Sequence, residues 1–341
     1  MSKKSITIGI THGDVNSISY EIIMKTFNDP RIMESCTPIV YGSSKVTSFY
    51  KKILPAIISP NFRFNIIKDV KQAVLKKANL INIVEDEIKI DIGQITPIAG
   101  DMARLSLEMA TKDLIEGNLD VLVTCPINKQ NVFSSTFNYS GQTEYLANAT
   151  KTKNFIMLMV ANDIRIGTVT THCALADVSK KISKKLIIDK INVLNQSLIN
   201  DFAIIKPRIA VLALNPHAGD NQLFGTEEQE KIIPAIQESF DKKIYAFGPF
   251  AADGFFGSGE FNKYDAILAM YHDQAMIPFK LLSFDEGVNY TAGLPFIRTS
   301  PAHGSAMSIA GQDIASFNSF QNAVYLACDI YRNRNNIINS D

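Results

Sequence analysis

Three of the five histidines in the chain directly follow short runs of apolar and β-branched residues. The runs are IRIGTVTT before His172, IAVLALNP before His217 and AILAMY before His272. Such runs are typical of buried β-strands, and loops that follow strands carry the chemistry of many α/β enzymes. Three imidazoles that converge at strand ends can hold a divalent cation and leave a coordination position for substrate. The sequence therefore predicts a catalytic metal site.

The remaining sequence supplies the elements that would position this site. Short apolar runs alternate with longer helical patterns, which predicts an α/β fold with a mostly parallel sheet covered by helices. Strands are expected over 6–10, 38–41, 121–124, 155–160, 164–170, 209–214, 244–247 and 266–270. Helices are expected over 20–27, 45–53, 102–116, 180–200, 227–240 and 317–332, with Asp101 as the cap of the third.

Composition narrows the class of protein. A chain of 341 residues suits two domains or one large α/β unit. Lysine plus arginine and aspartate plus glutamate both number 34, so no basic surface for nucleic acid or membrane is expected. The four cysteines form no C-x-x-C pair, and no signal peptide or run of ~20 apolar residues is present. We expect a cytoplasmic protein.

Four motifs carry a resemblance to a known family. They are TCPINK at 124–129, GQTEYL at 141–146, NPHAG at 215–219 and YHDQ at 271–274, the last followed by Lys280 and GVNYTAGLPFIR at 287–298. In this order they resemble the 4-hydroxythreonine-4-phosphate dehydrogenases, which act before pyridoxine phosphate ring closure in vitamin B6 synthesis. The resemblance runs from Ile8 almost to the C-terminus.

The resemblance implies an isopropylmalate-dehydrogenase-like fold, with two α/β domains flanking a central cleft. Residues 1–127 and 276–341 would form the cofactor-side domain, and residues 128–275 the metal and dimerisation domain. The family's enzymes are homodimers whose active site lies at the subunit interface, so a homodimer is expected here. The small-molecule partner would be a phosphorylated substrate.

The implied reaction is NAD-dependent oxidation of 4-phosphooxy-L-threonine to 2-amino-3-oxo-4-(phosphooxy)butanoate. This β-keto acid decarboxylates to 3-amino-2-oxopropyl phosphate. The resemblance implies His172, His217 and His272 as ligands of a divalent cation, with Zn²⁺ favoured by imidazole and Mg²⁺ or Co²⁺ as alternatives. The metal would lower the pKa of the substrate hydroxyl and stabilise the developing oxyanion. Asp273 could orient a ligand histidine or cap a helix.

The resemblance also implies substrate-binding roles for Lys280, Asn289 and Arg298. We expect Arg298 and Lys280 to hold the anionic ends of the substrate, since guanidinium suits phosphate and carboxylate. Lys129 is expected to take part in proton transfer. Asp253 is expected to support the catalytic site as a polar residue.

Two segments depart from the family pattern. Gln142 replaces the histidine that usually precedes Thr143, and this pair binds substrate in the family. An uncharged amide should bind phosphate more weakly or favour another group. In the loop 13–21, two glycines have become serines and both prolines are lost, which suggests either a relaxed loop or a lineage variant. His12 beside this loop is not expected to bind the metal.

No G-x-G-x-x-G follows the first strand, so a classical dinucleotide-binding site is not expected there. The sequence signal for a cofactor lies near the C-terminus instead. The segment PAHGSAMSIAG at 301–311 resembles the adenosine-binding loop of isocitrate and isopropylmalate dehydrogenases. The small residues Gly304, Ser305 and Ala306 would allow the backbone to approach a nucleotide, and His303 would contact the adenosine. Without a nearby basic cluster, NAD is favoured over NADP.

Three alternatives remain open. The first is a dehydrogenase of a related four-carbon sugar-acid phosphate, threonate or erythronate 4-phosphate, which Gln142 motivates. The second is a metal-dependent hydrolase that uses the three histidines to activate water. The third is a binding protein that has lost catalysis, which the altered first loop motivates.

Overall fold

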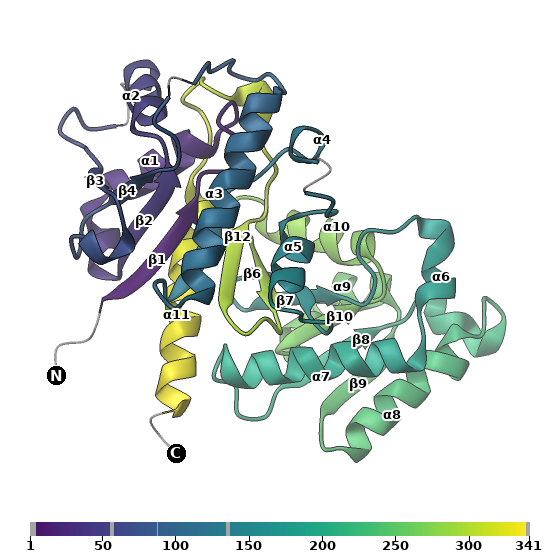
Figure 1. The fold of residues 1–341 in the computed structure, drawn as a ribbon. Helices are drawn as coiled ribbons and strands as arrows, with labels where there is room; N and C mark the ends of the chain where they lie inside the picture. The colour runs from purple at the N-terminus through teal and green to yellow at the C-terminus, as the bar shows by residue number, and fades with distance from the viewer. Residues whose placement is uncertain (1–4, 55–57, 87, 134–136, 339–341) are drawn as a thin grey trace. The chain divides into compact units, whose positions relative to one another are not determined.

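The computed structural model describes residues 5–54, 58–86, 88–133 and 137–338 (Figure 1). The chain divides into two compact units, each of which is described by itself. Unit 1 comprises Met1–Thr150 and Phe296–Tyr331, and unit 2 comprises Lys151–Pro295 and Arg332–Asp341.

Unit 1 is a parallel α/β layer. Among the described residues its strands follow the order β3-β4-β2-β1-β5-β12, and neighbouring strands pair in parallel. The strands are β1 (Ile6–Thr11), β2 (Cys36–Gly42), β3 (Asn65–Ile67), β4 (Asn79–Asn82), β5 (Val121–Thr124) and β12 (Ile297–Pro301). The helices are α1 (Ser19–Asn28), α2 (Ser44–Ile53), α3 (Pro97–Ile115), α4 (Lys129–Val132), α5 (Gln142–Ala149) and the first part of α11 (Asn318–Ile338). The side chains of β2 and β5 are all buried, as expected for a parallel sheet covered on both faces, and α3 runs beside β1 (Figure 1).

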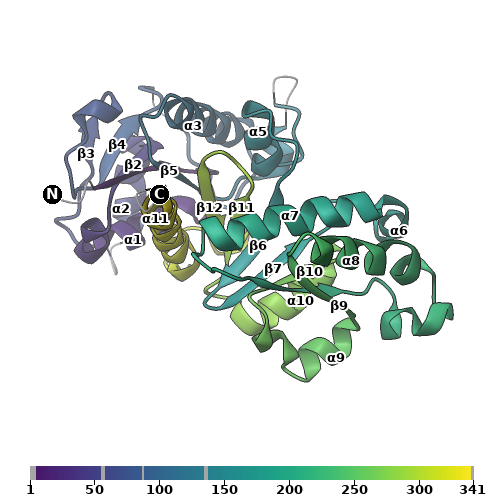
Figure 2. The same cartoon turned by 90° about the horizontal axis from the view of Figure 1, so that it is seen from below.

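Unit 2 is a mixed sheet with a parallel half. Its described strands follow the order β11-β6-β7-β10-β8-β9. The pairs β11–β6 and β6–β7 are antiparallel, whereas β7, β10, β8 and β9 are parallel to one another. The strands are β6 (Ile156–Ala161), β7 (Ile164–Thr168), β8 (Arg208–Leu212), β9 (Tyr245–Phe250), β10 (Ala266–Ala269) and β11 (Val288–Ala292). The helices are α6 (Val178–Lys181), α7 (Lys184–Asn200), α8 (Ile233–Asp241), α9 (Ala252–Gly257) and α10 (His272–Ser283); α7 and α8 pack side by side (Figure 2).

The predicted mostly parallel α/β fold is confirmed. All eight expected strands exist, and the structure adds β3, β4, β11 and β12. The helix expected over 180–200 is interrupted, because Ser183 accepts a hydrogen bond from the backbone N–H of Leu186 and starts α7 there. The expected cap Asp101 is wrong: α3 begins at Pro97, and Thr96 caps it by accepting from Ala99 N.

The units divide at different residues from the expected 1–127, 128–275 and 276–341. Residues 128–150 stay with unit 1 because α4 packs directly on α3, where Gly100 leaves no room for a side chain against the Asn131 backbone. Residues 276–295 stay with unit 2 because β11 is hydrogen-bonded to β6 and α10 packs on β7. Within the described residues, no helix is both long and apolar enough to cross a membrane.

Candidate active site

The three predicted metal-binding histidines follow three neighbouring strands of unit 2. His172 follows β7, His272 follows β10 and His217 follows β8, and these strands are adjacent and parallel in the order β7-β10-β8. The carboxyl ends of adjacent parallel strands meet at one edge of a sheet, which is where α/β enzymes bind their ligands. The topology therefore brings all three histidine-bearing loops to the same edge.

His172 and His272 already lie together. Their ring centroids are 6.4 Å apart. Nδ1 of His272 contacts Oδ1 of Asp273 at 2.7 Å, which leaves Nε2 as the nitrogen that can face a metal. Tyr271 occupies the cap position of α10, so Asp273 acts here as the partner of a histidine and not as a helix cap. This contact supports the interpretation of Asp273 as a residue that orients His272.

His217 stands on a left-handed turn, η4 (Pro216–Gln222), and its ring lies 6.3 Å from that of Phe224. Across the described part of the chain, no three His, Cys, Asp or Glu side chains lie close enough together to form a metal-binding group. The donor types nevertheless fit a borderline cation such as Zn²⁺. Two imidazoles lie together, one of them is held by a carboxylate, and a third imidazole follows the adjacent strand.

The other predicted residues of unit 2 are placed as follows. Asn289 lies on β11, and its Oδ1 is buried with no hydrogen-bond partner among the described residues. Such an atom costs free energy unless a ligand or water satisfies it. Asp253 is exposed in the first turn of α9, after β9, the strand next to β8. Lys280 is exposed on α10.

The predicted residues of unit 1 also gather at strand ends. β1, β5 and β12 are adjacent and parallel, so the loops that follow them share one edge of the sheet. These loops are the altered first loop after β1, the Cys125–Lys129 segment after β5 and the predicted cofactor loop after β12. Sequence order alone does not show this meeting, because β5 and β12 are far apart in the chain.

Arg298 is the buried cation of this edge. It lies on β12 and is 3% exposed. Its Nε and Nη2 donate to Oγ1 of Thr124 at 3.0 and 2.6 Å, and its Nη1 donates to Oγ1 of Thr143 at 3.3 Å. Burial lowers the pKa of Arg298 to about 10, against the opposing effect of Glu144, so the guanidinium stays charged at neutral pH. A hydrogen bond thereby links Arg298 and Thr143, two of the predicted substrate-binding residues.

Gln142, the residue that departs from the family pattern, points into the same region. Its Nε2 donates to the carbonyl of Cys125 at 2.8 Å, and its buried Oε1 has no partner within the described structure. Lys129 is exposed nearby: a β-carbon built on Gly141 would lie 3.9 Å from Lys129 Nζ. Residues 124, 129, 142, 143 and 298 therefore form one polar cluster at the start of α5. The Nε2 group of Gln142 already donates one hydrogen bond, to the carbonyl of Cys125.

The predicted cofactor loop is open at its centre. Nδ1 of His303 lies 2.9 Å from the carbonyl of Gly304. A side chain at Gly304 would meet no atom within 4 Å, and Ala306 has a positive φ of 43°. The carbonyl of Ser305 accepts from Ile18 N at 3.3 Å, which ties this loop to the first loop.

The first loop is buried and ordered by hydrogen bonds, so it is not relaxed. Ser17 Oγ donates to the carbonyl of Asp14 at 2.7 Å and accepts from the hydroxyl of Ser19 at 2.8 Å. Oδ1 of Asp14 accepts from Asn16 N, and Oδ2 accepts from Asn131 of α4. Hydroxyl groups thus fasten the loop where the family has glycines.

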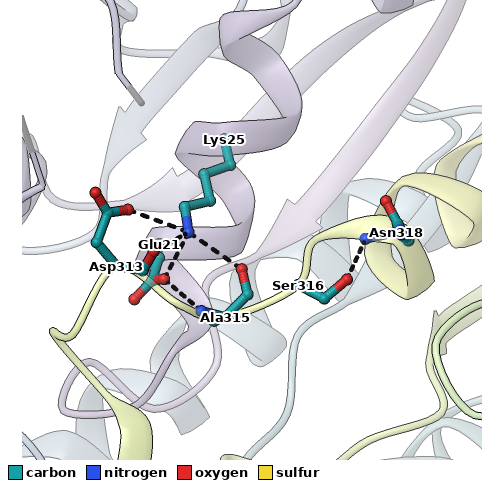
Figure 3. A network of polar contacts seen from close by, with 6 residues as sticks. All are labelled: Glu21, Lys25, Asp313, Ala315, Ser316 and Asn318. Carbon is teal, nitrogen blue, oxygen red and sulfur yellow. Dashed lines mark hydrogen bonds and ion pairs between the residues drawn. The ribbon is translucent and has the colours of Figure 1, made fainter. Parts of the chain in front are cut away.

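A buried ion cluster on α1, the helix that follows this loop, was not foreseen from the sequence (Figure 3). Lys25 Nζ contacts Glu21 Oε1 at 2.8 Å and Asp313 Oδ1 at 3.1 Å, and it donates to the carbonyl of Ala315 at 3.1 Å. Ala315 N donates back to Glu21 Oε1 at 2.9 Å. The cluster fastens α1 to the segment that follows the predicted cofactor loop. The only signal in the sequence is the i, i+4 spacing of Glu21 and Lys25.

In each unit, loops that carry predicted site residues follow neighbouring parallel strands, the arrangement of an α/β enzyme. Comparison with known proteins specifies the family. Residues 34–327 match the family described as pyridoxal phosphate biosynthetic protein PdxA, so the chain belongs to the PdxA family.

Individual relatives agree with this assignment. The chain is 47% identical over 338 residues to a 4-hydroxythreonine-4-phosphate dehydrogenase from Bacteroides thetaiotaomicron, with 98% of this chain and 91% of the relative covered. It is 37% identical to an Oceanobacillus iheyensis protein provisionally named D-threonate 4-phosphate dehydrogenase, with 97% and 99% covered. The crystal structure of a 4-hydroxythreonine-4-phosphate dehydrogenase from Klebsiella pneumoniae superposes with a TM-score of 0.81 at 34% identity, with 96% and 100% covered.

Proposed function

We propose that this protein catalyses the NAD-dependent oxidation of 4-phosphooxy-L-threonine to 2-amino-3-oxo-4-(phosphooxy)butanoate, which decarboxylates to 3-amino-2-oxopropyl phosphate. Membership of the PdxA family supports this reaction. The observation that carries it is the placement of His172, His272 and His217 after three adjacent parallel strands. A metal-dependent hydrolase has no support from the family. Cytoplasmic location remains an expectation from the four free cysteines.

The metal and the cofactor divide the chemistry of the proposal. A divalent cation held by the three histidines would polarise the substrate hydroxyl and the carbonyl formed from it. Asp273 would fix the ring of His272 so that Nε2 faces the cation. NAD would accept the hydride, with its adenosine against His303, Gly304, Ser305 and Ala306. The open space at Gly304 supports this placement.

The side chains of the polar cluster would hold the substrate and its protons. Arg298 remains charged and is oriented by Thr124 and Thr143, which suits it to an anionic group. Lys129 is the exposed amine of this cluster and would carry the proton that leaves the hydroxyl. Lys280 and Asn289 would bind the substrate from unit 2, and Asp253 would support the site as a polar residue.

A second substrate should be compared directly with 4-phosphooxy-L-threonine. Gln142 has no positive charge, and its amide already donates to the Cys125 carbonyl. D-Threonate 4-phosphate lacks the amino group of 4-phosphooxy-L-threonine, and a relative at 37% identity carries that substrate in its name. We therefore keep a four-carbon sugar-acid phosphate as the alternative substrate.

We also propose that the protein is a homodimer. α10, which begins at the predicted ligand His272 and carries Lys280, exposes a row of large apolar side chains. Ile277 and Leu281 of α10 are 68% and 85% exposed, and Phe284, directly after the helix, is 79% exposed. Apolar residues in one exposed row mark interaction surfaces in soluble proteins. A second copy covering this face would bring its own chain close to the predicted metal ligand.

One assay tests the reaction and the choice of substrate. The purified full chain is incubated with NAD and with Zn²⁺ or Mg²⁺, while the absorbance of reduced nicotinamide is followed. The substrates tested in turn are 4-phosphooxy-L-threonine, threonate 4-phosphate and erythronate 4-phosphate. We expect reduction with 4-phosphooxy-L-threonine and none when a chelator removes the metal. A faster reaction with threonate or erythronate 4-phosphate would replace the substrate. No reduction with any of them would refute the dehydrogenase proposal.

A further inference from the structure

The turn that carries His217 has an unusual backbone. Every residue from His217 to Gln222 has a positive φ, between 38° and 79°, and only Gly219 is a glycine. L-residues adopt the left-handed region one at a time, because Cβ then approaches the neighbouring carbonyl. A run of this length needs support from the surrounding structure, and such supported strain clusters at functional sites.

Glu228 supplies this support from one side. It is the first residue of the π-helical turn η5 (Glu228–Ile232) and is 1% exposed. Its Oε1 accepts from the backbone N–H groups of Leu214 and Asn215 at 2.9 and 2.8 Å, and its Oε2 accepts from Asn215 Nδ2 at 3.0 Å. The same carboxylate packs against Gly219, where a β-carbon would lie 2.8 Å from Oε2. One carboxylate thus fixes the entry to the turn and touches its middle.

The neighbouring Glu227 links this turn to the segment after His172. Its Oε2 accepts from Asn215 Nδ2 at 2.8 Å, and its Oε1 accepts from Ser179 Oγ at 2.5 Å. Ser179 belongs to α6, the helix that follows the His172 loop, and its carbonyl accepts from Lys231 Nζ at 3.1 Å. Asn215 therefore donates to both glutamates, and the glutamates connect two histidine-bearing segments.

We propose that Glu227 and Glu228 are positioning residues of the metal site, holding the segments that carry His172 and His217 in register with each other. The inference rests on the proposed metal-dependent function. Neither carboxylate is a metal ligand in it; both act through Asn215, Ser179 and the left-handed turn. Loss of either carboxylate should weaken metal binding, because groups that orient ligands typically contribute about 10- to 100-fold in affinity.

The test is direct titration of the full chain with Co²⁺, by calorimetry and by the visible absorption of bound cobalt. In Glu228→Gln, one carboxylate oxygen becomes an N–H₂ group that must face the donors of Leu214 or Asn215. We expect about 10- to 100-fold weaker Co²⁺ binding and a changed cobalt spectrum. We also expect turnover that recovers when the metal concentration is raised. Glu230→Gln, an exposed glutamate on the same turn, is the matched control and should bind Co²⁺ as the unmodified protein does.

A second pair of variants covers the case in which Glu228→Gln fails to fold. Ser179→Ala removes one hydrogen bond to Glu227 and should weaken Co²⁺ binding about tenfold, whereas Ser179→Thr keeps the hydroxyl and should restore it. Unchanged affinity in the folded variants would overturn the positioning role even if the protein binds metal and reduces NAD. Failure of the unmodified chain to bind Co²⁺ would refute the metal site and this inference together. Cobalt binding without NAD reduction would refute only the proposed reaction.

Discussion

Individual side chains of this protein owe their properties to their surroundings more than to their type. His12 and His272 are both histidines next to strands, yet His12 is fully buried beside Tyr20, whereas the side chain of His272 is 43% exposed and contacts a carboxylate. Arg298 is buried and held by two threonine hydroxyls, while Lys129 is exposed near the same cluster. The same kind of side chain is therefore placed in very different surroundings, and its residue type alone does not give its role.

Replacing Lys129 with alanine should lower kcat by about 10²- to 10⁴-fold, the usual contribution of a positioned acid–base group. The affinity for NAD should stay the same, because the predicted cofactor loop lies after a different strand. Steady-state kinetics and NAD titration measure the two effects separately. Lys151→Ala, at a lysine outside the cluster, serves as the control. An unchanged kcat in Lys129→Ala would remove Lys129 from the mechanism.

His12 should make the stability of the protein depend on pH. Burial lowers the pKa of His12 from 6.5 to about 4, outweighing its backbone contacts. Between these values the unfolded chain binds a proton that the native protein does not, so stability falls as the pH drops from about 6.5 to about 4, by at most about 3 kcal/mol. Thermal unfolding across this range should show a smaller pH dependence for His12→Phe. Equal slopes would mean that the pKa of His12 is not lowered in the native state.

Helices and loops of this protein are fastened by buried polar contacts as well as by apolar packing. α1 is joined through Lys25 and Glu21 to the segment around Asp313 and Ala315 (Figure 3). The turn that carries His217 is held by Glu227 and Glu228. Both sets of contacts hold segments that follow or precede predicted site residues.

The variant Lys25→Met should destabilise the protein by about 3–5 kcal/mol, because it leaves the buried carboxylate of Glu21 without its cation. Adding Glu21→Gln should recover part of this loss, since the remaining group is then neutral. Urea unfolding followed by circular dichroism measures both variants. Lys45→Met, at an exposed lysine on α2, should change stability by no more than about 0.5 kcal/mol. A loss for Lys25→Met as small as that of Lys45→Met would show that the cluster adds little.

At the scale of the whole molecule, each of the two units presents site residues at the carboxyl edge of a parallel sheet. The histidines predicted to bind the metal belong to unit 2, and the polar cluster with Arg298 and Lys129 belongs to unit 1. The proposed homodimer adds a second copy at α10, whose apolar row is exposed in the single chain.

The charge introduced by Leu281→Glu on α10 should separate the proposed dimer into monomers, because burying an unpaired carboxylate in an apolar interface is costly. Sedimentation velocity should show half the mass of the unmodified protein, and activity should fall with it. Ile205→Glu, at a residue that is 88% exposed in unit 2, should leave both unchanged. A single-chain mass for the unmodified protein would contradict the homodimer, and a dimer retained in Leu281→Glu would contradict its placement on α10.

The sequence by itself determined the α/β class and eight strands, because buried parallel strands are continuous apolar runs. It also proposed the residues that could do chemistry, because motifs such as NPHAG and TCPINK are local. It missed β3, β4, β11 and β12, which are short, partly polar or both, so that pairing with neighbouring strands decides them.

Only the tertiary structure decided which distant segments meet. β12 lies beside β5, so Arg298 reaches Thr124 and Thr143, and the residues 276–295 stay with unit 2 because β11 pairs with β6. The hydrogen bonds of Glu227 and Glu228 to the segment before His217 also could not be predicted from the sequence, since a glutamate in a helical segment usually faces solvent. Local sequence patterns were sufficient to identify candidate residues. The contacts of those residues depend on strand pairing and burial, which are long-range and cooperative, so only the tertiary structure shows them.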